Sequence, residues 1–352
     1  MDAAAPHLEL ALELAEALKL PEVLTQALTT KGVVLTRRNR LEEARILLDG
    51  ALTIALEHDI PAAAIRASNN LAVVFESSDR YADAFAIADG AAAIARRIGD
   101  RNWESMLFAG PISALVLLGR WDEALAREAE VNAAGMVSVE HLLVHLVEID
   151  CWRGNVEQAR SRLERSAELK THESVDHATG YRLHEAQLLR TEGSLRAAQE
   201  ALEQVLAARS ELGISYLHVK LGFVEALECA FELGDNGKLE QLLEIIEALR
   251  PGERPPLLEA HAVRFRAKLA GDAAAAEKDF RRAADIFRER ELIFWLAVTQ
   301  LEQAEWLSGL GQSDEAQPLL VNARETFKQL EAKPWLERVD AARIATLDEI
   351  PA

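Results

Sequence analysis

A six-residue turn motif recurs along the chain at intervals of about 40 residues. In its best form the motif has a turn residue, polar positions, an acidic residue and an alanine. The three best copies begin at Asn39, Asp79 and Gly119, and weaker copies occupy residues 154–159, 193–198, 271–276 and 311–316. A fixed period of this size is typical of stacked helical repeats. The motif therefore predicts an α-solenoid, in which each unit packs against its neighbours.

Each period holds two amphipathic helices, A and B, because apolar residues recur at helical spacing on both sides of the turn. We expect about eight pairs, at residues 21–38 with 41–57, 62–77 with 81–98, 103–118 with 121–134, 138–153 with 156–170, 177–191 with 195–211, 214–233 with 238–249, 257–270 with 273–290, and 292–309 with 314–330. The sequence thus predicts an all-α fold, a single right-handed superhelix over residues 1–352.

The two ends of the repeat array differ from its middle. Residues 7–19 resemble a B helix without its A partner, and residues 335–347 would form a helix that caps the stack. The unpaired first helix favours the interpretation that the chain is a segment of a longer protein, with a divergent cap as the alternative. Residues 250–256 contain three prolines and a glycine, which predicts an exposed connector, either an ordinary loop between repeats or a hinge.

Each position of the turn motif has a physical reason. A glycine such as Gly119 ends helix A by adopting a left-handed conformation at low cost. The acidic residue places negative charge in the first turn of helix B, where the helix dipole favours it. The alanine, as in Ala84 and Ala124, must be small because helix A of the same unit packs closely against it. Trp121 follows one turn directly, and that position predicts a partly exposed contact residue.

Composition excludes several classes of protein. Hydrophobic residues make up 49% and charged residues 28%, which indicates a folded chain. The net charge of −19 disfavours direct binding to nucleic acid or to an anionic membrane surface. Cys151 and Cys229 form no disulfide framework, so a cytoplasmic location is expected. The amino terminus lacks a signal-peptide pattern, and no apolar run is long enough to span a membrane.

The repeats resemble tetratricopeptide repeats. That pattern has a Gly or Ala on helix A twelve residues before the turn alanine. Gly32, Ala72 and Ala304 match it, and Asn70-Leu71-Ala72 matches the core of helix A. The period departs from the usual 34 residues of the family. The resemblance implies a right-handed superhelix whose concave face binds partners.

Residues 323–338 resemble the carboxyl end of large bacterial signalling regulators. Those proteins join a nucleotide-binding ATPase module to a helical-repeat arm, and they also carry a cyclase or a helix-turn-helix domain. The resemblance implies that the chain is the sensory or regulatory arm of such a regulator. The chain itself contains no phosphate-binding G-x-x-x-x-G-K-[ST] sequence, so ATPase activity is not transferred to it.

The same resemblance implies which residues line the concave groove. Transferred by register, the helix A positions that contact peptides are Gln26, Thr29, Val33, Arg66, Asn69, Asn70, Val73, His141, Val144 and Glu148. Arginine and carboxamide groups supply directed donors, so those of the second unit would hold a carboxylate or a peptide backbone. The alternative is structural: Asn70 would bond a neighbouring helix and Arg66 would pair with a nearby acid.

The segment from residue 141 to residue 148 could form either a metal site or a structural helix. His141, His145 and Glu148 lie at a spacing that would place three ligands on one helical face. The glutamate that follows the first histidine in zinc-protease helices is missing, and the neighbouring residues are apolar. We therefore expect a mostly buried helix with a polar stripe, and no metal or other cofactor.

The leading hypothesis is a non-enzymatic repeat module that binds a protein, peptide or small effector on its concave face. Neither cysteine lies in a recognisable nucleophile motif, and no G-x-S-x-G sequence occurs. The first alternative is a scaffold or self-association module, whose oligomeric state the sequence does not define. The more distant alternative is a metal protein or an enzyme that uses His141 and His145.

Overall fold

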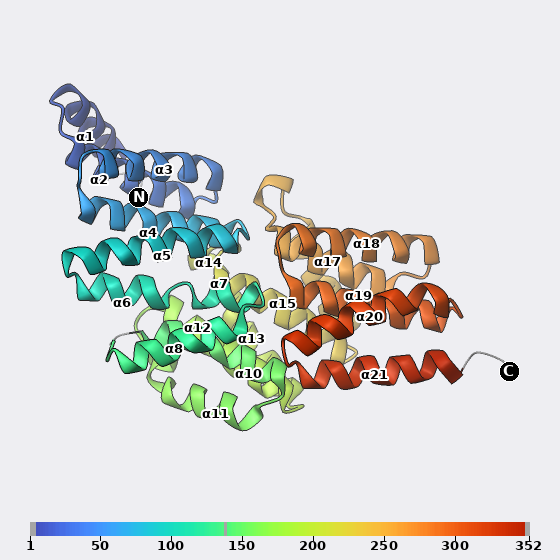
Figure 1. Cartoon of the computed structure of the whole chain (residues 1–352). Helices are drawn as coiled ribbons and strands as arrows, with labels where there is room; N and C mark the ends of the chain where they lie inside the picture. Colours follow the sequence, from blue (N-terminus) through green and yellow to red (C-terminus); the bar gives the residue numbers. More distant parts are fainter. Residues whose placement is uncertain (1–4, 137–138, 349–352) are drawn as a thin grey trace.

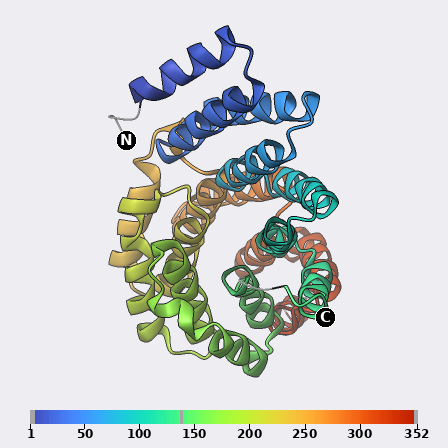
Figure 2. The ribbon, with the colours of Figure 1, turned by 90° about the vertical axis from the view of Figure 1, so that its left-hand side faces the viewer.

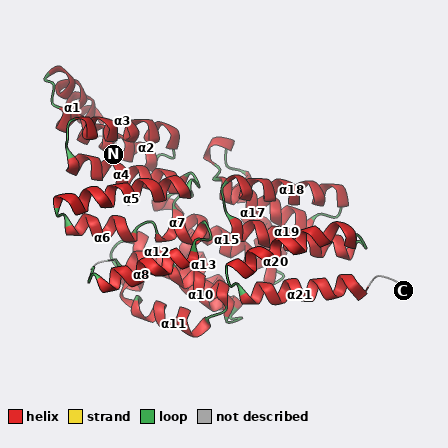
Figure 3. Cartoon of the chain, in the orientation of Figure 1, coloured by secondary structure: helices red, strands yellow, loops and turns green. Residues whose placement is uncertain are grey.

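The computed structural model describes residues 5–136 and 139–348, and all regular structure in that part of the chain is helical (Figure 1, Figure 3). The helices are α1 (Ala5–Ala17), α2 (Pro21–Arg37), α3 (Leu41–Glu57), α4 (Pro61–Ser77), α5 (Tyr81–Ile98), α6 (Arg101–Ala109), α7 (Ile112–Leu117), α8 (Trp121–Ala133), α9 (Glu140–Leu143), α10 (Leu146–Arg153), α11 (Val156–Arg165), α12 (Val175–Thr191), α13 (Leu195–Ala207), α14 (Arg209–Leu212), α15 (Leu217–Glu232), α16 (Asn236–Glu247), α17 (Pro256–Leu269), α18 (Ala273–Glu289), α19 (Ile293–Gly309), α20 (Ser313–Gln329) and α21 (Lys333–Asp348), with short 3-10 helices at Ala167–Thr171 and Pro251–Glu253. None of these helices is long and apolar enough to cross a membrane.

Consecutive helices pack as antiparallel pairs, which confirms the predicted α-solenoid. The described residues contain the expected eight pairs: α2 with α3, α4 with α5, α6–α7 with α8, α9–α10 with α11, α12 with α13, α15 with α16, α17 with α18, and α19 with α20. α1 packs on α2 before the first pair, and α21 covers the last pair.

Two A helices that were predicted to be continuous are broken. The expected helix over 103–118 divides at Gly110-Pro111, because proline lacks the N–H that an inner helical turn requires. The expected helix over 138–153 begins at Glu140 and divides between α9 and α10, and residue 138 lies outside the described residues. At this second break the amides of Val147 and Glu148 bond carbonyls three residues back, in place of four.

The turn motif has the packing role that the sequence predicts. All seven of its alanines are buried; they are Ala44, Ala84, Ala124, Ala159, Ala198, Ala276 and Ala316. Gly119 adopts φ +72°, and a Cβ built there would lie 2.5 Å from the Ile293 side chain. Asp79 occupies the same left-handed region with φ 56°, which aspartate and asparagine tolerate better than most residues.

The turns of the first units dock onto the second half of the chain, and this closes the solenoid. In Figure 2 the helices curl round so that the carboxyl-terminal ones pass beside the early units. The Asp79 carboxylate pairs with Lys220 of α15, and both side chains are fully buried. The same carboxylate accepts from the Leu257 amide at 2.7 Å and from the Tyr81 hydroxyl at 2.8 Å. One turn residue thus joins α5, α15 and α17.

Turn regions of the first and fourth units make comparable contacts with the second half of the chain. Asn39 donates to the Glu253 carbonyl at 3.3 Å and accepts from the Ser215 hydroxyl at 2.7 Å. The expected exposed connector at 250–256 is therefore a docked segment, in which Pro255 is buried. In the fourth unit, Arg153 donates to the Leu330 carbonyl at 3.0 Å.

An aromatic cluster forms the core of this closure. Trp121 stacks on Trp152 with ring centroids 5.4 Å apart, and Trp152 stacks on Phe294 of α19 at 4.2 Å. Phe294 in turn meets Trp335 of α21 edge-on at 5.4 Å. The expectation that Trp121 is a partly exposed contact residue is wrong: its side chain is buried, and its indole N–H donates to the Val116 carbonyl at 2.9 Å.

Candidate functional site

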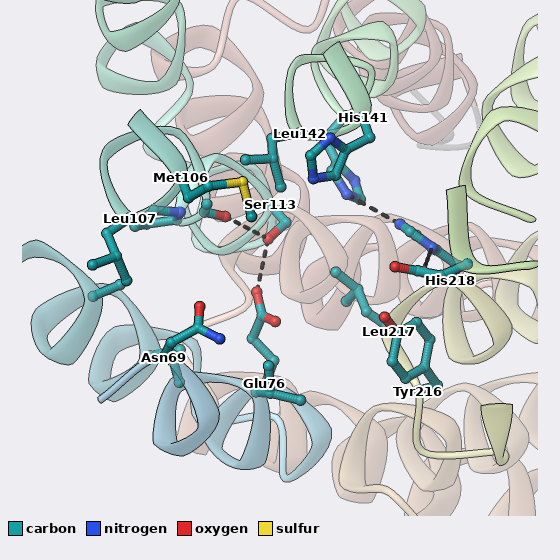
Figure 4. A pocket seen from close by; sticks show the side chains of 18 of the residues that line it. Asn69, Glu76, Met106, Leu107, Ser113, His141, Leu142, Tyr216, Leu217 and His218 are labelled. Carbon is teal, nitrogen blue, oxygen red and sulfur yellow. Dashed lines mark hydrogen bonds and ion pairs between the residues drawn. The ribbon is translucent and has the colours of Figure 1, made fainter. Parts of the chain in front are cut away.

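The closed solenoid surrounds a cavity of about 290 Å³ (Figure 4). Its lining comes mainly from the A helices of units two to six, which the superhelix brings side by side. The lining residues are Asn69, Ala72, Val73, Glu76 and Ser77 of α4, Ala84 and Ala88 of α5, Met106, Leu107, Gly110, Pro111 and Ser113 in and around α6 and α7, His141, Leu142 and His145 in and beside α9, Asp176 and His177 of α12, and Tyr216, Leu217 and His218 at the start of α15.

Histidines form a hydrogen-bonded chain beside the cavity. The Nε2 atoms of His145 and His218 lie 3.2 Å apart, and Nδ1 of His145 lies 3.2 Å from Nε2 of His184. Nδ1 of His184 is 2.7 Å from the Gln187 carboxamide oxygen. A neutral imidazole donates through one nitrogen and accepts through the other. His145, the middle member, therefore has no nitrogen left for another ligand.

A second pair of histidines lies at the edge of the cavity. The rings of His141 and His177 stack with centroids 4.1 Å apart, and His172 lies 4.5 Å beyond His177. Burial, together with the neighbouring His177 ring, lowers the pKa of His141 to about 4. Burial also lowers the pKa of His177, whose Nδ1 atom is buried and has no hydrogen-bond partner among the described residues. At neutral pH the His141 and His177 rings are uncharged hydrogen-bonding groups.

Asp176 holds one acidic corner of the cavity. Its Oδ1 atom lies 2.8 Å from Nδ1 of His218. Burial acts to raise the pKa of Asp176, but the neighbouring His218, Tyr216 and His177 side chains together outweigh burial, and the pKa is lowered. The carboxylate is therefore ionised at neutral pH. Burial and this neighbouring charge raise the pKa of Tyr216.

Glu76 holds the other acidic corner, and its carboxyl group points into the cavity in Figure 4. Its Oε1 atom accepts from the Ser113 hydroxyl at 2.8 Å. Burial raises the pKa of Glu76, while Ser113 and Lys220 oppose that rise. The Lys220 ammonium group does not reach this carboxylate, because it pairs with Asp79 and donates to the Glu76 carbonyl at 2.6 Å.

Three of the sequence-predicted groove residues line the cavity: Asn69, Val73 and His141. Arg66 instead bonds within the repeat stack, where its guanidinium group donates to the Gln26 side chain and to the Thr30 hydroxyl. Asn70 donates to the Arg66 carbonyl at 2.7 Å. The structural alternative is therefore not met in detail: Asn70 bonds within its own helix α4 and not to a neighbouring helix, and Arg66 is held by an amide and a hydroxyl in place of an acid.

The remaining predicted groove residues do not line the cavity. Val33 is half-buried elsewhere in the first unit. Thr29, Val144 and Glu148 are buried in the helix stack, and that corrects their assignment to a groove. The break between α9 and α10 shifts the helical register, so Val144 joins the core and Glu148 lies beside Gln187 and Glu225.

Sequence reasoning missed the acidic and aromatic members of the site: Glu76, Asp176, Tyr216 and His218. They come from units two, five and six, and they meet only because the solenoid closes. One signal was available, since the sequence places histidines at 141, 145, 172, 177, 184 and 218 on successive A helices or the turns before them. Clustered histidines in neighbouring units indicate a shared polar environment.

No group of three histidine, cysteine or acidic side chains in the described residues has the arrangement of a metal site. The spacing of His141, His145 and Glu148 therefore does not produce three converging ligands, because the helix is broken between them. Both cysteines are buried, and burial raises the thiol pKa of Cys151 to about 12 and that of Cys229 to about 11. Such thiols are protonated at neutral pH and are poor nucleophiles.

Comparison with known proteins adds distant structural likeness to solved structures, including that of a helical-repeat protein. No family model matches the chain, and no curated protein matches its sequence. The crystal structure of the pentatricopeptide repeat protein PPR10 from maize is similar with 13% sequence identity and a TM-score of 0.28. The match covers 92% of this chain and 65% of that one, so the chain spans about two thirds of the length of the matched protein. A likeness of this degree says nothing about ligands.

Proposed function

We propose that this chain is a non-enzymatic helical-repeat module that binds a small effector, or the end of a peptide, in the cavity described above. The observation that carries the proposal is a concave cavity whose apolar lining is combined with convergent polar groups. Ligand sites are typically concave, largely apolar and supplied with a few convergent polar groups. The cavity combines apolar side chains such as Met106, Leu107 and Leu217 with Glu76 and Asp176.

The regulatory role rests on the resemblance to the arms of ATPase-containing signalling regulators. A ligand in the cavity touches A helices of units two to six at once, so it would stabilise the closed arrangement over an open one. Ligand binding would thus shift the equilibrium between open and closed arms, and this shift would regulate a linked catalytic module. Direct binding to nucleic acid or membranes is not part of the proposal, because the net charge is −19.

A thermal-shift screen against a library of small polar metabolites and short peptides tests the proposal. Asn69→Trp is designed to fill the cavity, because Asn69 lines it and points inward in Figure 4. Asn322→Trp, at an exposed position on α20, is the matched control. Compounds that stabilise the wild type and Asn322→Trp, but not Asn69→Trp, support the proposal.

The same screen separates the proposal from the alternative of a self-association module. If every stabilising compound acts equally on Asn69→Trp, the cavity is not the binding site and the proposal fails. Light scattering of the purified chain measures its oligomeric state. If the chain forms a concentration-dependent dimer and the screen finds no compound that needs the cavity, self-association is favoured.

A further inference from the structure

We propose that the ligand of the cavity is a small organic cation, namely a protonated amine that carries a short apolar group. This inference rests on the proposed function and names the chemistry of the ligand. Its geometric basis is that two carboxylates, Glu76 and Asp176, face the cavity together with an apolar wall, while no lysine or arginine side chain of the described residues lines it.

The cavity carboxylates differ from most other acids in the interior in having no lysine or arginine partner among the described side chains. Buried acids elsewhere pair with basic side chains, as the ion pairs Asp79–Lys220, Asp150–Arg162, Glu225–Arg190, Glu228–Arg264 and Glu302–Arg264 show. Glu148 is an exception that lies outside the cavity lining, and burial raises its pKa well above the usual value. Uncompensated buried charge is costly, and in the described residues neither cavity carboxylate forms an ion pair with a lysine or arginine side chain, which indicates that a cation is missing.

The Asp176 corner supplies unused hydrogen-bonding capacity. Oδ1 of Asp176 and Nδ1 of His218 are buried and have no hydrogen-bond partner, although they lie 2.8 Å apart. The side chains of His218 and Asp176 are 9% and 29% exposed, so this corner is largely shielded from solvent. His218 lies against the Asp176 carboxylate, so Glu76 has no basic side chain beside it in the described cavity lining.

Glu76 also lacks a charged hydrogen-bond donor. Among the described residues, only the neutral Ser113 hydroxyl donates to its carboxylate, because the Lys220 ammonium group is paired with Asp79. An ammonium group carries three N–H donors, and hydrogen bonds to charged groups are the strong ones. The uncharged His141 and His177 rings offer further acceptors at the edge of the cavity.

The rest of the lining defines the other half of the ligand. Val73, Met106, Leu107, Leu142 and Leu217 form an apolar surface that suits a short hydrocarbon or aromatic group. An anion is disfavoured because it would meet two carboxylates and uncharged imidazoles. The overall charge of −19 also raises the local concentration of cations near the protein.

Calorimetric titration with 2-phenylethylamine at pH 7.5 tests the inference, with 2-phenylethanol and 3-phenylpropionate as the neutral and anionic probes of similar shape. We expect the amine to bind, the alcohol to bind at least tenfold more weakly, and the propionate not to bind. Glu76→Gln and Asp176→Asn should each weaken amine binding tenfold or more. Glu140→Gln removes an exposed acid beside His141 and should leave binding unchanged.

The outcomes distinguish the ligand class from the site. If the alcohol or the propionate binds as tightly as the amine, and Asn69→Trp abolishes that binding, the cation inference is wrong while the proposed function stands. If none of the three probes binds, the inference is also wrong, and the library screen decides the function separately. Equal weakening by Glu140→Gln would contradict it as well, because binding would then follow general surface charge. Glu76→Gln and Asp176→Asn each test the inference, so one variant is sufficient if the other fails to fold.

Discussion

Single alanines set the spacing between the helices of each unit. Ala124 is fully buried between helix A and helix B of the third unit. Ala124→Leu should therefore lower the free energy of unfolding by roughly 1–3 kcal/mol through overpacking. Ala126→Leu, at an exposed position on the same helix, is the control and should have little effect. Urea denaturation of both variants measures the difference, and equal stability would contradict the close packing.

The buried His184 imidazole makes stability depend on pH. Burial lowers its pKa to about 3, although the bond with Gln187 opposes that shift. The unfolded chain, with an ordinary histidine pKa near 6.5, therefore binds more protons than the folded chain below that pH. Stability is lost as the pH falls through this range, by about 2 kcal/mol at pH 5 for this group.

The variant His184→Gln isolates the effect of His184 on the pH dependence of stability. Buried acids with raised pKa values have the opposite effect, because they stabilise the fold as the pH falls. The gap in unfolding free energy between wild type and His184→Gln should shrink by about 2 kcal/mol from pH 7.5 to pH 5. Chemical denaturation at several pH values gives this double difference. A gap that is constant with pH would show that His184 titrates normally in the folded protein.

At the residue scale, the sequence predicts packing better than it predicts the site. The turn alanines follow from the repeat, because a small residue at a fixed position has one packing explanation. Trp121 was misjudged since its burial depends on Phe294, which lies more than 170 residues later. His145 likewise bonds His184 and His218 of other units, and local spacing contains no information about them.

At the scale of helices, the sequence predicts the structure best. The motif and the helical periodicity locate eight pairs, and the errors lie at breaks inside predicted helices. Two of these are in A helices, and two are in the B helices expected over 156–170 and 195–211, which divide after Arg165 and Ala207. The break at Gly110-Pro111 was visible in the sequence, since proline inside a predicted helix interrupts it. The break between α9 and α10 has no such residue. It is stabilised by the histidine contacts across units that follow it.

The contact between the turn after α4 and helix α15 depends on one buried ion pair. Lys220→Met leaves the Asp79 carboxylate without its cation, and breaking a buried pair from one side typically costs about 3–5 kcal/mol. The double variant Lys220→Met with Asp79→Asn should recover much of this loss, because no charge remains buried. Thermal and urea unfolding of the single and double variants measure the coupling.

The matched control for this pair is Lys238–Glu203, a partly exposed pair with Nζ and Oε1 3.4 Å apart. Exposed ion pairs contribute little, so Lys238→Met should change the unfolding free energy by less than about 1 kcal/mol. If Lys220→Met were as mild as Lys238→Met, the docking of the turn onto α15 would not be a stabilising contact. Asparagine at position 79 keeps the left-handed turn accessible, so backbone strain does not obscure the comparison.

At the scale of the whole molecule, closure converts a repeat array into an enclosed site. Asn39, Asp79, Gly119 and Gly154 mark successive turns, and each lies against the later part of the chain between Ser215 and Pro334. Their spacing along the sequence predicts a stack but not its curvature, because curvature accumulates from small rotations between units. Glu76, Asp176 and His218 therefore could not be grouped in advance, although Glu76 and His218 lie on predicted helices and Asp176 lies one residue before another.

Crosslinking across the closure tests this account most directly. Asn39 and Ser215 are in side-chain contact, so the double variant Asn39→Cys with Ser215→Cys places two thiols together across the closure, at a contact that involves neither Cys151 nor Cys229. A short bifunctional thiol reagent should join the two positions within one chain, independently of protein concentration, while either single variant yields none. The account predicts a crosslinked peptide between these positions by mass spectrometry. An open solenoid would give no such peptide, although both cysteines would still react with a monofunctional reagent, and that result would contradict the closed fold and the cavity that depends on it.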